Sequence, residues 1–355
     1  MILQIVAGRL RWIAGRKLIC AGFAVAIALG ALHSTSLGAS ETSSSCEARI
    51  ETREIGKFSV DPIDEASGLA LAPDGEHFFV TNDSGDLPRF FRTKLDGSSI
   101  EDFRIHEIVA GAQKSWKPFD AEELNVGSCP KELGGDCLVI ADIGDNRDRR
   151  KFVELVFIRL SDIPAPLSVT TKNSKPISVP VSKKLRLVYP DGPRNAEAFA
   201  VLNSRFGVIV SKQQDRKSRA TRPAGVYVVD FETAKIAHVA ELDVPAWVKD
   251  QGLAALVTGL SVAERTSRSV RMVLLTYRDA IELSFETNIM SSVTWPPRPW
   301  SVKARSVFKI DPLEQQEAIT FDKKGTGFYY TTEQPLTILG FKSASIRWAE
   351  KMTCR

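Results

Sequence analysis

One short pattern recurs five times along the chain and sets the strongest limit on its fold. Each copy places an oxygen-bearing side chain directly before a short apolar run, and the five side chains belong to Ser67, Glu122, Glu197, Thr258 and Glu317. Neighbouring copies lie between 55 and 75 residues apart, and a turn signal and a second apolar run follow most of them. A repeat of strands and turns at this spacing is typical of a β-propeller blade. We therefore predict an all-β propeller with five blades, with six as the alternative because residues 280–310 are difficult to place.

Composition agrees with a folded domain and excludes several classes of function. The chain has 355 residues, of which 43% are hydrophobic and 25% are charged, enough for a sizeable core. Its net charge of +4 is small, and its Lys and Arg residues are spread along the chain, so a nucleic-acid partner is not expected. A glycine-rich phosphate loop and the Gly-x-Ser-x-Gly elbow of serine hydrolases are both absent from the sequence.

The N-terminus has the order of a secretory signal peptide. Basic residues up to Lys17 precede an apolar run over 18–32, and small residues follow up to Ala39. We predict that residues 1–39 are cleaved, that 40–56 form a flexible segment, and that 57–355 form one propeller domain. The apolar run is shorter than the roughly 20 residues that span a membrane, so no stable span is expected after cleavage. An uncleaved anchor is the alternative. The mature protein is expected to be a secreted or periplasmic monomer.

Four cysteines remain in the mature chain, namely Cys46, Cys129, Cys137 and Cys354. An even number of cysteines in an exported protein indicates disulfides, and three pairings are open. We favour Cys129 with Cys137, which closes a short loop, and Cys46 with Cys354, which would join the two ends of a closed ring. The cysteine spacing and the scarcity of histidine argue against a zinc site.

The recurring oxygen-bearing residue also predicts a metal site. Inner strands of a propeller run along a central tunnel, so equivalent residues of the five blades form a ring around the axis. Three carboxylates cannot share a tunnel of low dielectric constant without a rise in pKa or a bound cation. Calcium prefers oxygen ligands. We predict a calcium ion (Ca2+) held by Ser67, Glu122, Glu197, Thr258 and Glu317. The alternative is that these side chains cap strands or hydrogen-bond to neighbouring blades.

The order Ser, Glu, Glu, Thr, Glu resembles that of the calcium-activated nucleotidase (apyrase) family. Members of this family are secreted five-bladed propellers that hydrolyse nucleoside di- and triphosphates, and their blades donate Ser, Glu, Glu, Ser and Glu to one calcium ion. Thr258 departs from this pattern but keeps the hydroxyl group. The resemblance is a pattern across about 270 residues, and it extends to exported bacterial phytase-like or esterase-like propellers. It implies a five-bladed fold and a tunnel calcium.

A second set of polar residues follows the second strand of each blade. If these strands end on one face, one opening is surrounded by Asp83, Asp142, Asp145, Lys212, Arg278 and Glu333. Acidic groups there could hold another calcium or activate water, while cationic groups hold phosphate oxygens. We therefore predict a catalytic group of Asp83, Asp145, Lys212 and Arg278. The alternative is that these residues are turn formers and solvated charges.

Two functions follow from these expectations. The first is a calcium-dependent phosphohydrolase that acts on nucleotides or other phosphate esters at the funnel mouth. The second is a non-catalytic propeller that binds an unidentified protein or glycan and holds calcium as a structural ion. The fold does not decide between them.

Overall fold

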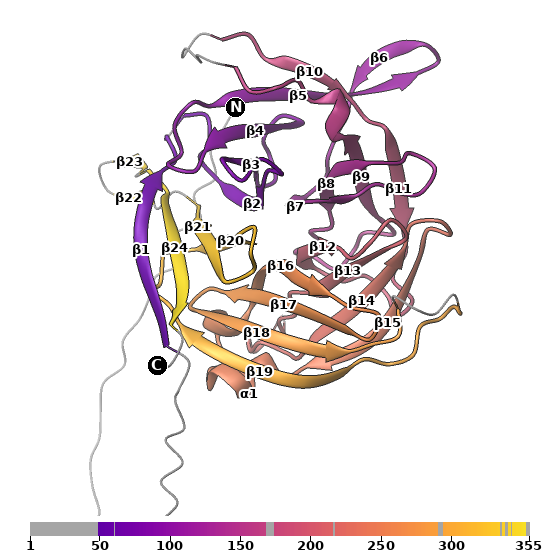
Figure 1. The fold of residues 1–355 in the computed structure, drawn as a ribbon. Coiled ribbons are helices and arrows are strands. Elements are labelled where there is room, and N and C mark those ends of the chain that lie inside the picture. Colours follow the sequence, from indigo (N-terminus) through magenta and orange to yellow (C-terminus); the bar gives the residue numbers. More distant parts are fainter. Residues whose placement is uncertain are drawn as a thin grey trace, which may run out of the picture. The chain divides into compact units, whose positions relative to one another are not determined.

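The computed structural model describes residues 49–59, 61–167, 174–215, 217–289, 294–333, 336–337, 340–341 and 343–352. These residues form a five-bladed β-propeller, as predicted (Figure 1). The predicted signal peptide and the proposed Cys46–Cys354 pair lie outside the described residues. No helix in the described ranges combines the length and apolar character that crossing a membrane requires.

Each blade is built on a four-stranded antiparallel sheet, and in the first four blades these strands run from the inner edge outward in chain order. Blade 1 consists of β2 (Ala66–Leu71), β3 (His77–Asn82), β4 (Arg89–Lys94) and β5 (Glu101–Val109). Blade 2 consists of β7 (Ala121–Ser128), β8 (Asp136–Asp142), β9 (Val153–Arg159) and β11 (Lys183–Leu187). Blade 3 consists of β12 (Ala196–Val201), β13 (Phe206–Ser211), β14 (Ala224–Asp230) and β15 (Lys235–Leu242).

The last two blades complete the ring. Blade 4 consists of β16 (Val257–Arg265), β17 (Ser269–Thr276), β18 (Asp279–Glu286) and β19 (Ser301–Lys309). Blade 5 consists of β20 (Gln316–Phe321), β21 (Gly327–Thr332), β24 (Ser345–Met352) and β1 (Arg49–Lys57). Within 280–310, the described residues form the outer strands of blade 4. The six-bladed alternative is therefore wrong.

Short elements decorate this ring. Blade 1 is widened by β6 (Ala112–Ser115), which forms a hairpin with β5, and by β10 (Ile177–Pro180), which pairs with β5 in parallel. A second small hairpin consists of β22 (Leu336–Thr337) and β23 (Gly340–Phe341). The described residues include three short helical elements, η1 (Leu160–Asp162), α1 (Val244–Val248) and η2 (Leu253–Ala255).

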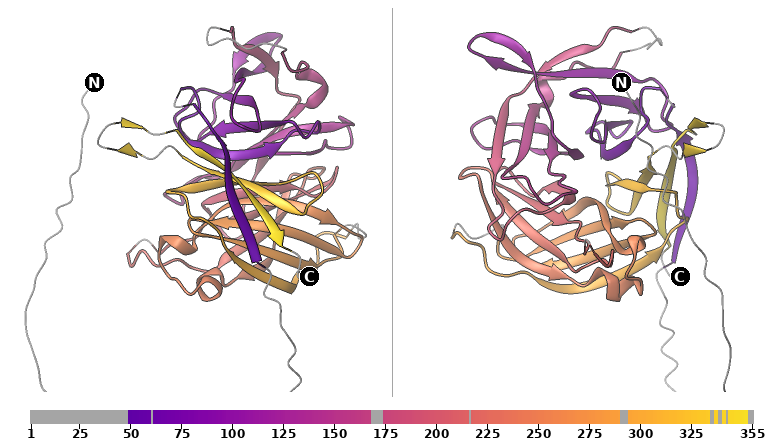
Figure 2. Two further views of the ribbon diagram at one scale, coloured as in Figure 1. Left: turned by 60° about the vertical axis from the view of Figure 1, so that its left-hand side comes forward. Right: turned by 180° about the vertical axis from the view of Figure 1, so that it is seen from behind.

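The first strand of the chain closes the ring. β1 lies beside β24 and pairs with it antiparallel, from Arg49 opposite Met352 to Lys57 opposite Ser345 (Figure 2). Residues 49–56 therefore belong to blade 5, although we expected them in a flexible segment before the propeller. Without β1, the outer edge of β24 would expose unpaired backbone groups, and this pairing satisfies them.

Apolar side chains fill the space between blades. Each of the five interfaces between neighbouring blades holds its own cluster of buried residues. Between blades 2 and 3, Phe157 packs edge-on against Phe231 with ring centroids 5.2 Å apart, and Phe78 meets Tyr329 in the same way between blades 1 and 5. Because every blade packs on two others, the inner strands are held firmly around the axis.

The predicted disulfide within blade 2 is confirmed. Cys129 and Cys137 are bonded and buried where the chain turns from β7 into β8. Nine residues, counting both cysteines, form the closed loop, and the sequence separation is 8.

Removal of this bond is expected to destabilise the protein. Replacement of both cysteines, Cys129→Ala with Cys137→Ala, should lower the free energy of unfolding by about 2–3 kcal/mol, since the loop gains freedom in the unfolded chain. Urea unfolding with and without reductant measures the change. Reductant should destabilise the unmodified protein and leave the double variant unaffected. Equal sensitivity of the two proteins to reductant would contradict the assignment.

Candidate functional site

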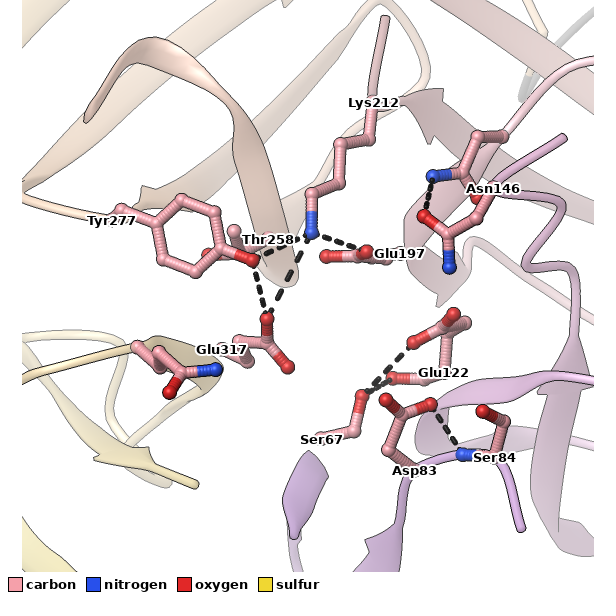
Figure 3. Close-up of polar contacts among 12 residues, drawn as sticks. Ser67, Asp83, Ser84, Glu122, Asn146, Glu197, Lys212, Thr258, Tyr277 and Glu317 are labelled. Carbon is pink, nitrogen blue, oxygen red and sulfur yellow. Dashed lines mark hydrogen bonds and ion pairs between the residues drawn. The ribbon is translucent and has the colours of Figure 1, made fainter. Parts of the chain in front are cut away.

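A β-bulge falls on the oxygen-bearing residue of every inner strand. In blade 1, Ala66 lies opposite Asn82 and Gly68 lies opposite Thr81, so Ser67 has no partner in the ladder. The same shift in pairing skips Glu122, Glu197, Thr258 and Glu317. A bulged residue departs from the alternation of the strand and its side chain takes a new direction. All five side chains are buried, and Figure 3 shows them around one centre. The five positions are therefore equivalent in the fold, whereas their binding of calcium stays a prediction.

The two hydroxyl-bearing members join neighbouring blades. Ser67 Oγ donates a hydrogen bond to the backbone oxygen of Glu122 at 2.8 Å, and Thr258 Oγ1 donates to that of Gln316 at 2.9 Å. These contacts link blade 1 to blade 2 and blade 4 to blade 5. They match the alternative role that we gave the ring, in which its side chains hydrogen-bond to an adjacent blade.

A glycine follows each of these hydroxyl residues for a steric reason. A Cβ at Gly68 would lie 2.6 Å from the backbone nitrogen of Leu124, and a Cβ at Gly259 would lie 2.8 Å from the backbone oxygen of Glu317. Real side chains do not approach backbone atoms so closely. The glycines therefore allow the inner strands to come near enough for the hydroxyl groups to reach the next blade.

A lysine supplies the positive charge on the other side of the ring. The ammonium group of Lys212 forms an ion pair with Glu197, lies 3.8 Å from Glu317 Oε1, and donates to Tyr277 Oη at 2.7 Å. Tyr277 in turn donates to Glu317 Oε1 at 2.6 Å (Figure 3). Burial alone would lower the pKa of Lys212, but the two carboxylates outweigh it and hold this pKa well above its ordinary value. Two ring glutamates thus have a cation from the chain itself.

The remaining ring glutamate lies in a cluster of acids. Carboxylate oxygens of Asp83, Asp120 and Glu122 all lie within 4.8 Å of one another. Asp83 follows β3, and Asp120 immediately precedes β7. Gly144 packs against the cluster so closely that a Cβ there would lie 2.2 Å from Glu122 Oε1. We call Asp83, Asp120 and Glu122 the acid cluster.

Burial and mutual repulsion raise the pKa values of three acids around the tunnel, namely Asp83, Glu197 and Glu333. Burial, followed by repulsion from Glu317, raises the pKa of Asp83 to about 6. Burial raises the pKa of Glu197 to about 8 despite Lys212, and it raises that of Glu333 to about 9 with further repulsion from Glu317. The tunnel therefore holds more carboxyl groups than Lys212 alone can keep in the charged form, and several of them retain a proton to a higher pH than usual.

The donor set fits a divalent cation. Glu197 Oε2 is buried and accepts no hydrogen bond from any residue that the structure describes. Among those residues, Lys212 is the one cation that forms an ion pair with the ring or the acid cluster. An unpartnered buried oxygen beside crowded carboxylates is an arrangement that a hard cation with oxygen ligands would stabilise.

The structure places the four residues predicted to be catalytic in different sets of contacts, and their catalytic role stays a prediction. Lys212 contacts the ring and Asp83 belongs to the acid cluster, whereas Asp145 Oδ2 accepts the backbone N–H groups of Arg149 at 2.6 Å and Arg150 at 2.7 Å. These bonds stabilise the turn after β8, which is the alternative role that we gave for Asp145.

Arg278 lies in a separate set of contacts. It forms ion pairs with Asp250 at 3.2 Å and Asp279 at 3.4 Å, and it donates to the backbone oxygen of Val248. Its guanidinium group therefore fixes the segment around α1, and no described contact connects it to Lys212 or to the acid cluster.

Sequence reasoning missed three residues of the site. Tyr277, not Arg278, occupies the place in blade 4 that Lys212 occupies in blade 3, one residue after the second strand. Asp120 stands two residues before the recurring position. Glu123 is fully buried and accepts the backbone N–H groups of Leu124 at 3.0 Å and Leu260 at 3.4 Å, so it connects blade 2 to blade 4. A search for the first residue after each second strand, instead of for the nearest charged residue, would have identified Tyr277.

Comparisons with known proteins do not assign a family. No family model matches the chain, and no curated protein matches it. The solved structures that it resembles include hydrazine synthase of Kuenenia stuttgartiensis, with 9% identity, a TM-score of 0.41 and coverage of 76% of this chain and 68% of that one. Another is the PQQ-bound aldose sugar dehydrogenase of Streptomyces coelicolor, with 11% identity, a TM-score of 0.39 and coverage of 86% and 99%.

A third is the soluble aldose sugar dehydrogenase of Escherichia coli in its apo form, with 10% identity, a TM-score of 0.39 and coverage of 85% of this chain and 100% of that one. At these values the similarities carry no inference about activity. The resemblance to the nucleotidase family stays a resemblance of pattern, because no comparison shows that family.

Loss of the internal cation should destabilise the tunnel. Lys212→Met leaves Glu197 and Glu317 buried without their ammonium partner, and removal of one member of a buried ion pair costs about 3 kcal/mol or more. Urea unfolding at pH 8 measures the loss. Lys303→Met, which removes a lysine paired with Glu286 on the surface, is the control and should change the stability by less than about 1 kcal/mol. Equal effects of the two variants would contradict the role of Lys212.

The protein without metal should lose stability as the pH rises. Asp83, Glu197 and Glu333 have folded-state pKa values of about 6, 8 and 9, whereas acids in an unfolded chain titrate near 4. Between about pH 4 and pH 9 the folded state therefore holds protons that the unfolded chain has released, and the free energy of unfolding falls.

Urea unfolding in chelator at pH 5, 7 and 9 measures this dependence. Glu333→Gln should reduce the fall in the free energy of unfolding with rising pH, mainly between pH 7 and 9. A control variant, Glu264→Gln, should leave this pH dependence of the free energy of unfolding unchanged, because the Glu264 side chain is 61% exposed. Stability that does not change over this range would contradict the charge balance described above.

Proposed function

We propose that the tunnel binds a calcium ion at the acid cluster. The observation that carries the proposal is the convergence of Asp83, Asp120 and Glu122, whose carboxylate oxygens lie within 4.8 Å of one another beside the buried ring. Calcium takes about 6–8 oxygen ligands and accepts water among them. Three carboxylates supply the charge that such an ion requires.

This proposal moves the ion away from the centre of the predicted ring. Glu122 is shared between the ring and the acid cluster, while Lys212 serves Glu197 and Glu317. The unpartnered Oε2 of Glu197 offers a further oxygen on the buried side. The tunnel thus has two cationic positions, one for an ammonium group and one for a divalent ion.

We also propose that the protein acts outside the cytoplasm. The signal-like segment 1–39 supports export, and so does the Cys129–Cys137 disulfide, since such bonds persist in oxidising compartments. In this setting one function that the geometry allows is that of a binding propeller with a structural calcium ion. Its partner would be a protein, a glycan or a small molecule.

Hydrolysis of a phosphate ester or anhydride is the second candidate. Arg150 favours it, because its guanidinium group lies beside the acid cluster, bonds Asp142 Oδ1 at 2.8 Å, and acts to lower the pKa of Asp120. Metal-assisted phosphate hydrolysis needs a metal, a positioned water and a cationic clamp. Arg150 is paired with Asp142, just as Lys212 and Arg278 are paired with other acids of the chain. We take Arg150 as the clamp because its charge acts on Asp120 of the acid cluster.

Calcium should bind to the stripped protein and raise its melting temperature. Calorimetric titration of chelator-treated protein should give one site, and Asp120→Asn or Glu122→Gln should weaken calcium binding at least tenfold. Glu264→Gln is the matched control and should bind like the unmodified protein. Circular dichroism before titration confirms that each variant is folded. An absence of binding, or equal binding by the acid-cluster variants and the control, would refute the site.

The second candidate has its own experiment. Phosphate release from ATP, ADP and p-nitrophenyl phosphate is measured with calcium and with chelator. A hydrolase should show release that requires calcium and falls at least a hundredfold in Asp83→Asn and Arg150→Met. Calcium binding without any release would support the binding propeller and end the hydrolase proposal.

A further inference from the structure

A groove opens at the rim of blade 2, outside the tunnel. Its volume is about 820 Å³, and it lies between the hairpin of β5 and β6, which projects from blade 1 in Figure 1, and the outer strands β9 and β11. The ion pair between Glu107 on β5 and Lys184 on β11 ties the two sides together. Such a volume is in the range of small-molecule sites in proteins, roughly 300–1,000 Å³.

Positive charge dominates the lining of this groove. Its basic residues are Lys114, Lys117, Arg150, Lys151, Lys184 and Arg186, and its acidic residues are Glu107, Asp142 and Glu154. The three acids are all engaged, because Lys184 pairs with Glu107, Arg150 with Asp142, and Arg186 with Glu154.

Three lysines of the groove remain after its acids have been paired. Lys114, Lys117 and Lys151 are exposed and form no ion pair with any residue in the described part of the chain. A concave surface with an excess of one sign of charge concentrates ions of the opposite sign. The groove is therefore suited to an anion.

Two phenylalanines give the groove an aromatic surface. Phe119 is 68% exposed and Phe152 is 39% exposed, which is unusual for side chains of this size. The guanidinium groups of Arg150 and Arg186 lie over these rings, 4.7 Å and 4.6 Å from the centroids. Exposed aromatic rings held in place by arginines are platforms on which a planar group can stack.

Two buried donors near the groove have no acceptor in the described part of the chain. Trp116 lines the groove, and its indole Nε1–H has no hydrogen-bond partner among the described residues. A neighbouring cavity of about 260 Å³ shares Arg150, Lys151 and Phe152 with the groove and is lined by Tyr189, whose buried hydroxyl also has no partner in that part of the chain. Buried polar groups are nearly always paired in native proteins.

We propose that this groove binds a small organic anion that carries an aromatic ring. The anionic group would lie at Lys114, Lys117 and Lys151, and the ring would lie against Phe119 and Phe152. The size of the groove favours a small molecule over a segment of an acidic protein. The proposal does not depend on calcium, because none of the acid-cluster residues lines the groove.

The test uses the full mature chain and a fluorescent aryl anion, 8-anilinonaphthalene-1-sulfonate. We expect saturable binding to one site, with affinity reduced at least fivefold in Phe119→Ala and in Lys151→Glu. The matched controls are Leu253→Ala, which removes an exposed apolar side chain (56% exposed) on η2, and Lys131→Glu, which reverses an exposed charge outside the groove. Both controls should bind the probe like the unmodified protein.

Competition identifies the anionic group. Displacement of the probe by 1-naphthoate indicates a carboxylate ligand, and stronger displacement by 1-naphthyl phosphate indicates a phosphate ligand; either result supports the proposal. Displacement by an oligoglutamate peptide but by neither naphthyl compound would overturn it in favour of an acidic protein partner. Probe binding that the groove variants leave unchanged, or that the controls reduce equally, would overturn it as well.

The same titration in chelator separates this proposal from that of calcium binding. Affinity for the probe should persist when calcium is removed. Loss of calcium binding in Glu122→Gln with unchanged probe binding would show that the two sites bind their ligands independently. Circular dichroism of each variant excludes probe uptake by unfolded chain.

Discussion

The burial of several carboxylates around one axis is the constraint on which the rest of this structure depends. Each carboxylate that leaves water must gain a hydrogen bond, a cation or a proton. Glu123 accepts backbone N–H groups from two blades, but burial outweighs these bonds and raises its pKa well above the ordinary value. Glu197 and Glu317 share the cation Lys212, and Glu317 also accepts a hydrogen bond from Tyr277. The acid cluster accepts hydrogen bonds from the Ser67 hydroxyl and the Ser84 backbone, but within the described chain it forms no ion pair, so a proton or a metal ion is left to balance its charge.

The bulges explain why acids gather at the axis at all. In a regular strand every second side chain faces the neighbouring blade, and the apolar residues at those positions form the five interblade clusters. One extra residue per inner strand breaks that alternation and leaves a side chain free to turn inward. A polar residue at this place does not disturb the packing of the blade, so the fold can carry a polar ring inside an apolar framework.

The sequence predicted the parts of the fold that depend on local pattern. The recurring motif identified the five equivalent positions, and cysteine spacing identified the loop that the disulfide closes. Closure by β1 was not predictable in the same way, because it pairs residues about 300 positions apart and no local signal marks that partnership. The region 280–310 was ambiguous because long outer strands resemble the start of another blade.

Within the site, the limits were also physical. Lys212 was expected at an open mouth, free to hold phosphate, but β13 ends so near the bulge of β12 that the ammonium group reaches Glu197 instead. Arg278 attracted attention by its charge, while the neighbouring Tyr277 has the inward position. Charge in a sequence shows that a residue needs a polar partner, but it does not show whether that partner is a ligand or the chain itself.

The tunnel and the groove are built on one short segment, and this gives them a common electrostatic origin. Phe119 lines the groove, and the next residue, Asp120, belongs to the acid cluster. Asp142 fixes both by accepting their backbone N–H groups, at 3.1 Å from Phe119 and 2.8 Å from Asp120. Arg150 bonds Asp142 and covers the ring of Phe119, and its charge also acts on Asp120. One buried arginine thus adds positive charge to the groove and moderates the repulsion within the acid cluster. The same side chain therefore contributes to the proposed anion-binding groove and to the proposed cation site in the tunnel, which are built from residues only a few positions apart.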